Sequence, residues 1–144
     1  MGEFKEIGER GESTVKEFKV SSSKQIQAID VTSEVEAIVR REKWRDGVLF
    51  VFVPHCTAAL IVNEFEPNIA ADYEKYFSEL RKQCWSHDEI DDNAAAHLGS
   101  AIAGSERFFF VKNGELVLGT WQRVILMELD GPRDRCVLLE FVEK

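Results

Sequence analysis

The sequence predicts an α+β domain with a mainly antiparallel, β-sandwich-like sheet core and about three helices. Three observations lead to this class. Runs of β-branched and aromatic residues occur near both ends of the chain, helical patterns lie between them, and an Asn-Gly pair joins two of the runs. No glycine-rich loop follows a predicted strand, which argues against a dinucleotide-binding α/β fold.

The chain length and charge limit the classes of function. With 144 residues, the chain fits a single domain over residues 1–144, in which residues 1–12 form a loose N-terminal segment. The net charge of -8 argues against nucleic acid and membrane surfaces as partners. No apolar run approaches the roughly 20 residues that span a bilayer. The three cysteines show no CxxC spacing, so we expect a reducing, cytoplasmic location.

The first strand and helix are predicted near the N-terminus. Residues 13–20 alternate between apolar and polar side chains, which is typical of a strand with one face in solvent. Asp30, Thr32 and Ser33 precede Glu36 in the pattern of a capping box, so a helix is expected to begin there and to end before Gly47.

The middle of the chain predicts two strands and a second helix. Residues 48–53 are apolar on both faces, which indicates a central strand, and residues 58–62 form the next one. Pro67 fits the first position of a helix. The apolar stripe of this helix consists of Ile69, Tyr73, Tyr76, Phe77 and Leu80.

An Ala-rich helix and a hairpin follow. Asn93 is the candidate N-cap of the helix and Gly104 its terminator. Residues 108–118 predict a hairpin, because Asn113-Gly114 tolerates the positive φ angles of a two-residue turn. Two more strands are expected at 123–129 and 135–142, with a turn at 130–133.

The three histidines of the chain, His55, His87 and His97, are candidate metal ligands. Three imidazoles suit zinc and leave a fourth position open for water or substrate. No two of them are spaced i,i+4, so no local metal-binding motif supports the site. The alternative is that these histidines are partly exposed or hydrogen-bonded in the core.

Polar residues after the central strand form the first candidate cluster. Thr57 and Glu64 follow His55 closely, and the end of a strand is a place where a rigid scaffold can hold catalytic side chains. An equally good interpretation is that Thr57 only makes a hydrogen bond in a turn and that Glu64 only faces solvent. Cys56 suggests a thiol nucleophile, but neighbouring residues of a strand point to opposite faces, which makes pairing with His55 awkward.

Two further clusters lie later in the chain. Backbone amides at the start of the Ala-rich helix, near Asn93, could receive a phosphate, assisted by Ser105. Trp121 and Gln122 could hold a flat ring, and Arg133 could bind a phosphate bidentately. The alternative is that Trp121 packs in the core and Arg133 pairs with Glu128 or Asp134.

Three motifs follow one another along the chain: His55-Cys-Thr-Ala-Ala-Leu60 with Asn63-Glu64, Asn93-Ala-Ala-Ala-His97-Leu98, and Leu118-Gly-Thr-Trp-Gln122 with Glu128 and Asp130-Gly-Pro-Arg133. Taken together, they resemble the YjbQ-like family, whose members are usually described as uncharacterised or as secondary thiamine-phosphate synthase. The resemblance covers residues 13–142. Cys56 departs from it, because relatives often carry Thr at this position.

The resemblance implies a homotrimer with sites near the subunit boundaries. It also implies a reaction that joins an aminopyrimidine diphosphate to a thiazole phosphate with release of pyrophosphate. It favours a metal site of His55, His87 and His97, which would more naturally hold zinc, whereas magnesium would arrive with the diphosphate.

From the residues and the resemblance we expect His55, Glu64 and Arg133 to be catalytic. The residues expected to contact a small phosphorylated substrate are Thr57, Asn93, Ser105, Trp121, Gln122 and Glu128. Two alternatives stay open: a metal-dependent hydrolase with Glu64 or Glu128 as base, and a non-catalytic trimer that binds a metal or a phosphorylated metabolite.

Overall fold

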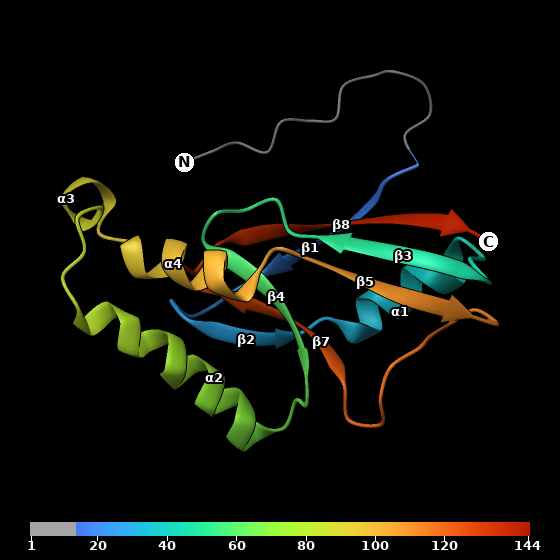
Figure 1. Ribbon diagram of the computed structural model, residues 1–144, viewed down its shortest axis with the longest axis horizontal. Helices are drawn as coiled ribbons and strands as arrows, with labels where there is room; N and C mark the ends of the chain where they lie inside the picture. Colours follow the sequence, from blue (N-terminus) through green and yellow to red (C-terminus); the bar gives the residue numbers. More distant parts are fainter. Residues whose placement is uncertain (1–13) are drawn as a thin grey trace.

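The computed structural model describes residues 14–144, drawn in colour in Figure 1. The expected loose segment 1–12 lies outside these residues. In chain order, the elements are β1 Lys16–Ser21, β2 Gln27–Asp30, α1 Thr32–Arg41, β3 Gly47–Phe52, β4 Ala58–Asn63, α2 Pro67–Glu79, a 3-10 turn Leu80–Lys82, α3 Asp88–Asp91, α4 Ala94–Ala103, β5 Glu106–Lys112, β6 Glu115–Leu116, β7 Arg123–Glu128 and β8 Asp134–Glu143.

The strands form two antiparallel sheets, so the predicted α+β class is confirmed. The five-stranded sheet has the order β1-β8-β3-β5-β6, and the three-stranded sheet has the order β2-β7-β4. Apolar side chains of both sheets and of α1 share the main core; they include Val35, Leu49, Leu60, Leu126 and Leu139. The predicted central strand is β3, third of the five strands in its sheet.

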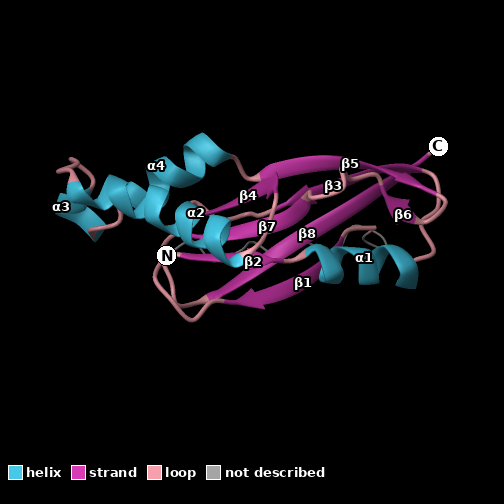
Figure 2. Cartoon of the chain, turned by 90° about the horizontal axis from the view of Figure 1, so that it is seen from below, coloured by secondary structure: helices cyan, strands magenta, loops and turns pink. Residues whose placement is uncertain are grey.

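The helices gather at the two ends of the sheets. Figure 2 shows α2, α3 and α4 at one end of the molecule and α1 towards the other. A second apolar cluster joins Ile125 and Met127 of β7 to Ala96 of α4 and Phe77 of α2, so these two helices cover the three-stranded sheet. Across residues 14–144, no helix combines the length and apolar character that crossing a membrane requires.

The outer face of β3 and β5 differs from the expectation of a strand buried on both faces. Leu49 and Val51 are fully buried, but Phe50 and Phe52 lie on the opposite face and are exposed. Phe50 pairs in register with Phe108 of β5, which is 61% exposed. The apolar run therefore signals a central strand correctly, while half of its apolar side chains lie on the open face of the sheet.

Two predicted helix caps are wrong in detail. The residue before α1 is Val31, whose side chain makes no cap bond, and the Asp30 carboxylate accepts from the backbone N–H of Thr32 at 3.0 Å instead. Thr32 instead accepts a hydrogen bond on Oγ1 from the backbone N–H of Val124 at 2.8 Å and donates to Asp30 at 2.6 Å, which ties the helix start to β7. Asn93 does occupy the N-cap position of α4, but its side chain makes no cap bond.

Other local predictions are confirmed. Glu66 caps α2 by accepting from the backbone N–H groups of Asn68 and Ile69, with Pro67 at the first position. Asn113 and Gly114 have φ angles of 53° and 81°, as a primed hairpin turn requires. The sequence pattern did not predict β2 or the four-residue α3, and Tyr76 of the α2 stripe is exposed.

Candidate functional site

A cavity of about 670 Å³ opens where β3 ends, β8 begins and α4 starts. Its lining comes from the loop after β3, the α3–α4 segment, and the turn between β7 and β8. These residues are Pro54, His55, Cys56, Thr57, Asp91, Asn93, His97, Asp130, Arg133 and Arg135. Seven of them are named in the sequence analysis, so the structure brings parts of all three candidate clusters together.

His55 is oriented by one hydrogen bond. The backbone N–H of Cys136 donates to His55 Nε2 at 2.9 Å. A neutral imidazole that accepts at Nε2 carries its proton on Nδ1 and presents a donor there. Burial, together with the nearby Arg135 charge, lowers the pKa of His55 below its usual range, so the neutral form is favoured.

Glu128 and Arg135 form a buried ion pair beneath the cavity. Glu128 is 0% exposed and Arg135 is 3% exposed. Arg135 Nε donates to both carboxylate oxygens at 3.0 Å, while Nη2 donates to Glu128 and to the backbone oxygen and Oγ1 of Thr57. Ser22 donates to Glu128 at 2.7 Å. Since Arg135 and Ser22 occupy its oxygens below the cavity surface, Glu128 is a positioning residue, and the expectation that it contacts substrate does not fit.

Arg135 is a candidate site residue that the sequence pattern did not indicate. It lines the cavity, and within residues 14–144 its Nη1 has no hydrogen-bond partner. The sequence gives little indication of this residue, because an exposed arginine is common at the start of an apolar strand. Its burial against Glu128 becomes visible only when β7 and β8 are placed side by side.

Arg133 pairs with Asp130, whereas the sequence analysis considered Glu128 or Asp134. Arg133 Nε donates to the backbone oxygen of Asp130 at 2.9 Å, and Nη2 donates to its carboxylate at 3.2 Å. The side chain keeps a third of its surface exposed, so the guanidinium is fixed at the cavity wall and open to a ligand.

The start of α4 differs from the predicted phosphate site. The backbone N–H of Ala94 donates to the carboxylate of Asp88 at 2.9 Å, so an acidic side chain already occupies this position. Asn93 donates to Asp130 at 3.2 Å, and its Oδ1 is buried with no hydrogen-bond partner among residues 14–144. Ser105 lies after the other end of α4 and donates to Glu106, so the predicted role in substrate binding does not fit it.

His87 and His97 lie together, but the three histidines do not form a metal centre. The rings of His87 and His97 are 4.7 Å apart in an edge-to-face arrangement. In the described part of the chain His87 Nε2 is buried and makes no hydrogen bond, with the Asp91 carboxylate 3.9 Å away. Among residues 14–144, no group of three His, Cys, Asp or Glu side chains is arranged to hold a metal ion. His55 uses Nε2 as an acceptor and carries the proton on Nδ1, so it has no free lone pair for a metal. Of the three imidazoles, only those of His87 and His97 lie together, and His55 does not join them as a ligand.

Glu64, Trp121 and Gln122 lie away from the cavity. Strand β4 separates His55 from Glu64, and five steps along a strand span about 17 Å. Asn63 at the end of β4 pairs with Arg123 at the start of β7, which places Trp121 and Gln122 at this far end as well. Trp121 is 72% exposed, so the alternative that it packs in the core is wrong. Within one chain these residues cannot act together with His55.

The cysteines have different surroundings. Cys56 is exposed and lines the cavity, and Cys84 is exposed elsewhere. Cys136 is buried and lies within hydrogen-bond reach of Glu17; burial and this neighbour raise the pKa of its thiol to about 12. Neither Cys56 nor Cys136 makes a hydrogen bond to the His55 side chain through its thiol among the described residues, so no thiol nucleophile is assembled.

The fold and the cavity define a class: a small two-sheet α+β domain with one histidine- and arginine-lined cavity at the ends of its strands. The family model described as UPF0047 protein YjbQ-like matches residues 16–144. The chain therefore belongs to the YjbQ/UPF0047 family, whose function is not established.

Individual relatives agree with this assignment. A UPF0047 protein of Archaeoglobus fulgidus is 37% identical over 126 residues, covering 86% of this chain and 98% of its own. YugU of Bacillus subtilis is 33% identical over 132 residues, covering 89% and 98%. A solved hypothetical protein of Aeropyrum pernix superposes with a TM-score of 0.87 at 42% identity, covering 90% of this chain and 98% of that one. A solved protein of unknown function from Sulfolobus solfataricus gives 0.86 at 40% identity, covering 90% and 96%.

Proposed function

We propose that the cavity binds a phosphorylated metabolite and that the protein is a transferase resembling secondary thiamine-phosphate synthase. The observation that carries the proposal is that three hydrogen-bond donors line one cavity: His55 Nδ1–H, the Arg133 guanidinium and Arg135 Nη1. All three are held in place by other protein groups, so they meet a phosphate without first being ordered.

The proposed reaction places a simple demand on these donors. The bond between the pyrimidine methylene carbon and the diphosphate oxygen breaks, and its electron pair leaves with the diphosphate. The lone pair of the thiazole nitrogen forms the new carbon–nitrogen bond, which gives thiamine phosphate and pyrophosphate. His55, Arg133 and Arg135 stabilise the charge that develops on the departing diphosphate, and the cavity holds the two reactants close together.

The charges around the cavity bear on the cofactor. Two arginines are balanced by Asp91 and Asp130 on the same lining, and His55 is neutral. A diphosphate would therefore meet little net positive charge, so we propose that it enters as its magnesium complex. The carboxylates of Asp91 and Asp130 offer the oxygen ligands that magnesium prefers.

The test is conversion of the two phosphorylated precursors by the purified protein with magnesium, followed as pyrophosphate release. We expect His55→Gln and Arg133→Gln to lower the rate by about 10²- to 10³-fold, as is typical when one oriented donor is removed. Arg41→Gln is the matched control, because this arginine is exposed and pairs with Glu42 away from the cavity.

Two outcomes would overturn the proposal in different ways. Saturable pyrophosphate binding without product would leave a binding protein in place of an enzyme. Equal turnover by wild type and both cavity variants would show that the reaction does not take place in this cavity. The hydrolase alternative lacks a base: Glu128 is engaged by Arg135 and Glu64 lies at the far end of β4.

We also propose that the protein is a homotrimer in which the exposed face of β3 and β5 is covered by other subunits. Phe50, Phe52, Phe108 and Phe110 are exposed side by side on this face, together with Val142 of β8. A contiguous apolar patch of this kind usually marks an interface. In sedimentation analysis we expect Phe108→Glu to dissociate the trimer, whereas Tyr76→Glu, an equally exposed aromatic position on α2, leaves it intact. A wild-type monomer would refute the assembly.

Within this assembly we propose that a neighbouring subunit supplies Trp121 and Glu64 to the cavity, since both lie away from it in their own chain. If the site is shared, mixing an inactive Arg133→Gln protein with an inactive Trp121→Ala protein should restore part of the activity, since some mixed trimers contain an intact site. Mixed trimers without any restored activity would show that each chain works alone.

A further inference from the structure

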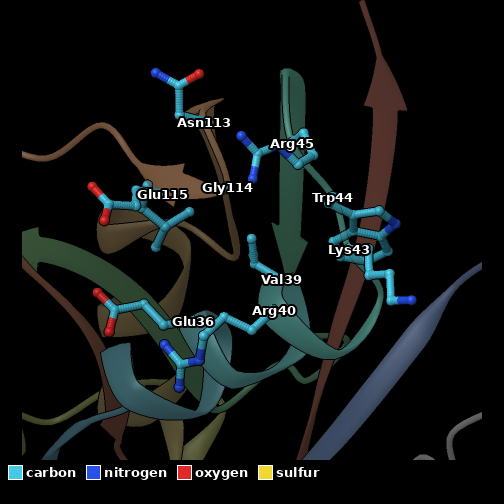
Figure 3. Close-up of a pocket in the computed structure, with 10 residues that line it drawn as sticks. Glu36, Val39, Arg40, Lys43, Trp44, Arg45, Asn113, Gly114 and Glu115 are labelled. Carbon is cyan, nitrogen blue, oxygen red and sulfur yellow. The ribbon is translucent and has the colours of Figure 1, made fainter.

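We propose a second binding site, separate from the cavity at His55, for a small molecule that carries both a carboxylate and an ammonium group, such as a free α-amino acid. The site is a cleft of about 770 Å³ between α1 and the β5–β6 hairpin. Figure 3 shows the side chains that line it. It shares no lining residue with the cavity described above.

The walls of the cleft are fixed by the fold. The backbone N–H of Gly114 donates to the backbone oxygen of Arg45 at 2.9 Å, and that of Asn113 donates to the carboxylate of Asp46 at 3.1 Å. Trp44 stacks on Phe141 with ring centroids 5.2 Å apart. The hairpin turn and the segment after α1 are therefore held against one another, so the cleft does not depend on a mobile loop.

The charged side chains of the cleft have both signs and are unpaired. Arg40, Lys43 and Arg45 supply positive charge, and Glu36 and Glu115 supply negative charge. Within residues 14–144, none of these five side chains forms an ion pair or hydrogen bond. By contrast, their neighbour Arg41 pairs with Glu42 at 3.1 Å.

This combination selects the chemistry of the ligand. An arginine binds a carboxylate through two parallel hydrogen bonds, and a glutamate accepts hydrogen bonds from an ammonium group. A di- or triphosphate has no donor for Glu36 and Glu115, whereas an ammonium group supplies hydrogen bonds to them. Leu116 is only partly buried and adds an apolar surface to the lining, which suits an aliphatic side chain. The cleft also has room for a dipeptide, which carries the same two charged ends.

The experiment is calorimetric titration of the full-length protein with each common L-amino acid and with leucyl-leucine. We expect saturable binding of at least one of them, with a Kd between about 10 µM and 1 mM, because so small a ligand buries few atoms. Arg45→Gln and Glu115→Gln should each weaken this binding at least about tenfold. Arg41→Gln is the matched control and should bind as wild type does.

Blocked ligands separate the two charges. The amide of the best ligand lacks the carboxylate, so it should bind weakly and be insensitive to Arg45→Gln. The N-acetyl form lacks the ammonium group, so it should bind weakly and be insensitive to Glu115→Gln. Thermal unfolding checks that each variant is folded; if Arg45→Gln is not, Arg40→Gln takes its place.

Three results would overturn the inference. They are no binding of any probe by wild type, equal binding by wild type and the cleft variants, and an N-acetyl form that binds as tightly as the free amino acid. The last result would indicate a plain anion site. None of these outcomes depends on turnover at the His55 cavity, so the two proposals fail independently.

Discussion

Neutralising Glu128 by the substitution Glu128→Gln should destabilise the fold strongly, because it leaves Arg135 charged, buried and unpaired. Arg135 donates from Nε and Nη2 to the Glu128 carboxylate, and hydrogen bonds to a charged group contribute about 1.5–3 kcal/mol each. Glutamine keeps one oxygen that can accept, but it carries no charge and turns an NH2 group toward the guanidinium, so we expect the roughly 3–5 kcal/mol found when one partner of a buried ion pair is removed. Domains of this kind have only about 5–15 kcal/mol of total stability.

Urea unfolding at neutral pH, followed by tryptophan fluorescence, measures this loss. With a slope of about 2 kcal/mol/M, the midpoint should fall by roughly 1.5–2.5 M. The matched control is Glu79→Gln, which removes the same charge from an exposed pair with Lys82 at 2.8 Å and should leave the midpoint unchanged. The double variant Glu128→Gln/Arg135→Met should lose less than the sum of the two single variants. If Glu128→Gln and Glu79→Gln shift the midpoint equally, burial of the pair does not determine its strength, and the reasoning is wrong.

Three further predictions follow from individual residues. Lys43 follows the last turn of α1 with a φ of 56°, a conformation that favours glycine. Lys43→Gly should therefore raise the free energy of unfolding, measured in urea, by about 1 kcal/mol. A decrease would mean that the lysine side chain stabilises the fold by more than its backbone conformation costs. The pKa of His55 is lowered from 6.5 in the fold, so below about pH 6.5 the unfolded chain binds a proton that the folded chain does not. Wild type should therefore lose more stability than His55→Gln as the pH falls. Parallel plots of the free energy of unfolding against pH for the two proteins would contradict this. Because His55 has no free lone pair, His55→Ala should not change zinc binding, measured by elemental analysis after reconstitution. Loss of stoichiometric zinc in both His55→Ala and His97→Ala would establish the three-histidine centre that the geometry disfavours.

The sequence predicts elements whose signals are local. The hairpin at Asn113-Gly114 and the start of α2 at Pro67 depend on backbone angles and capping within a few residues, and both are confirmed. The position of β3 also follows from its apolar run. That Phe50 lies on an open face does not follow, because apolar residues buried by a second sheet and those left for an interface look alike in one sequence.

The candidate site was predicted only in part, because its geometry depends on the path of the chain. His55 and Glu64 are close in sequence, yet β4 runs straight between them and places them at opposite ends of the sheet. His55 and Arg133 are far apart in sequence and line one cavity. Arg135 gains its role only from burial against Glu128, which no spacing rule encodes.

The three cysteines give this chain a built-in chemical reporter. Alkylating reagents attack thiolates, so buried Cys136, with its raised pKa, should be spared while exposed Cys84 is modified at a rate that ligands at the cavity do not alter. Cys56 stands on the cavity wall, so any molecule bound there shields it. The ratio of labelling at Cys56 to labelling at Cys84, read by peptide mass spectrometry, therefore measures occupancy without an assay for turnover. Metabolite mixtures can be screened in this way before the physiological ligand is known.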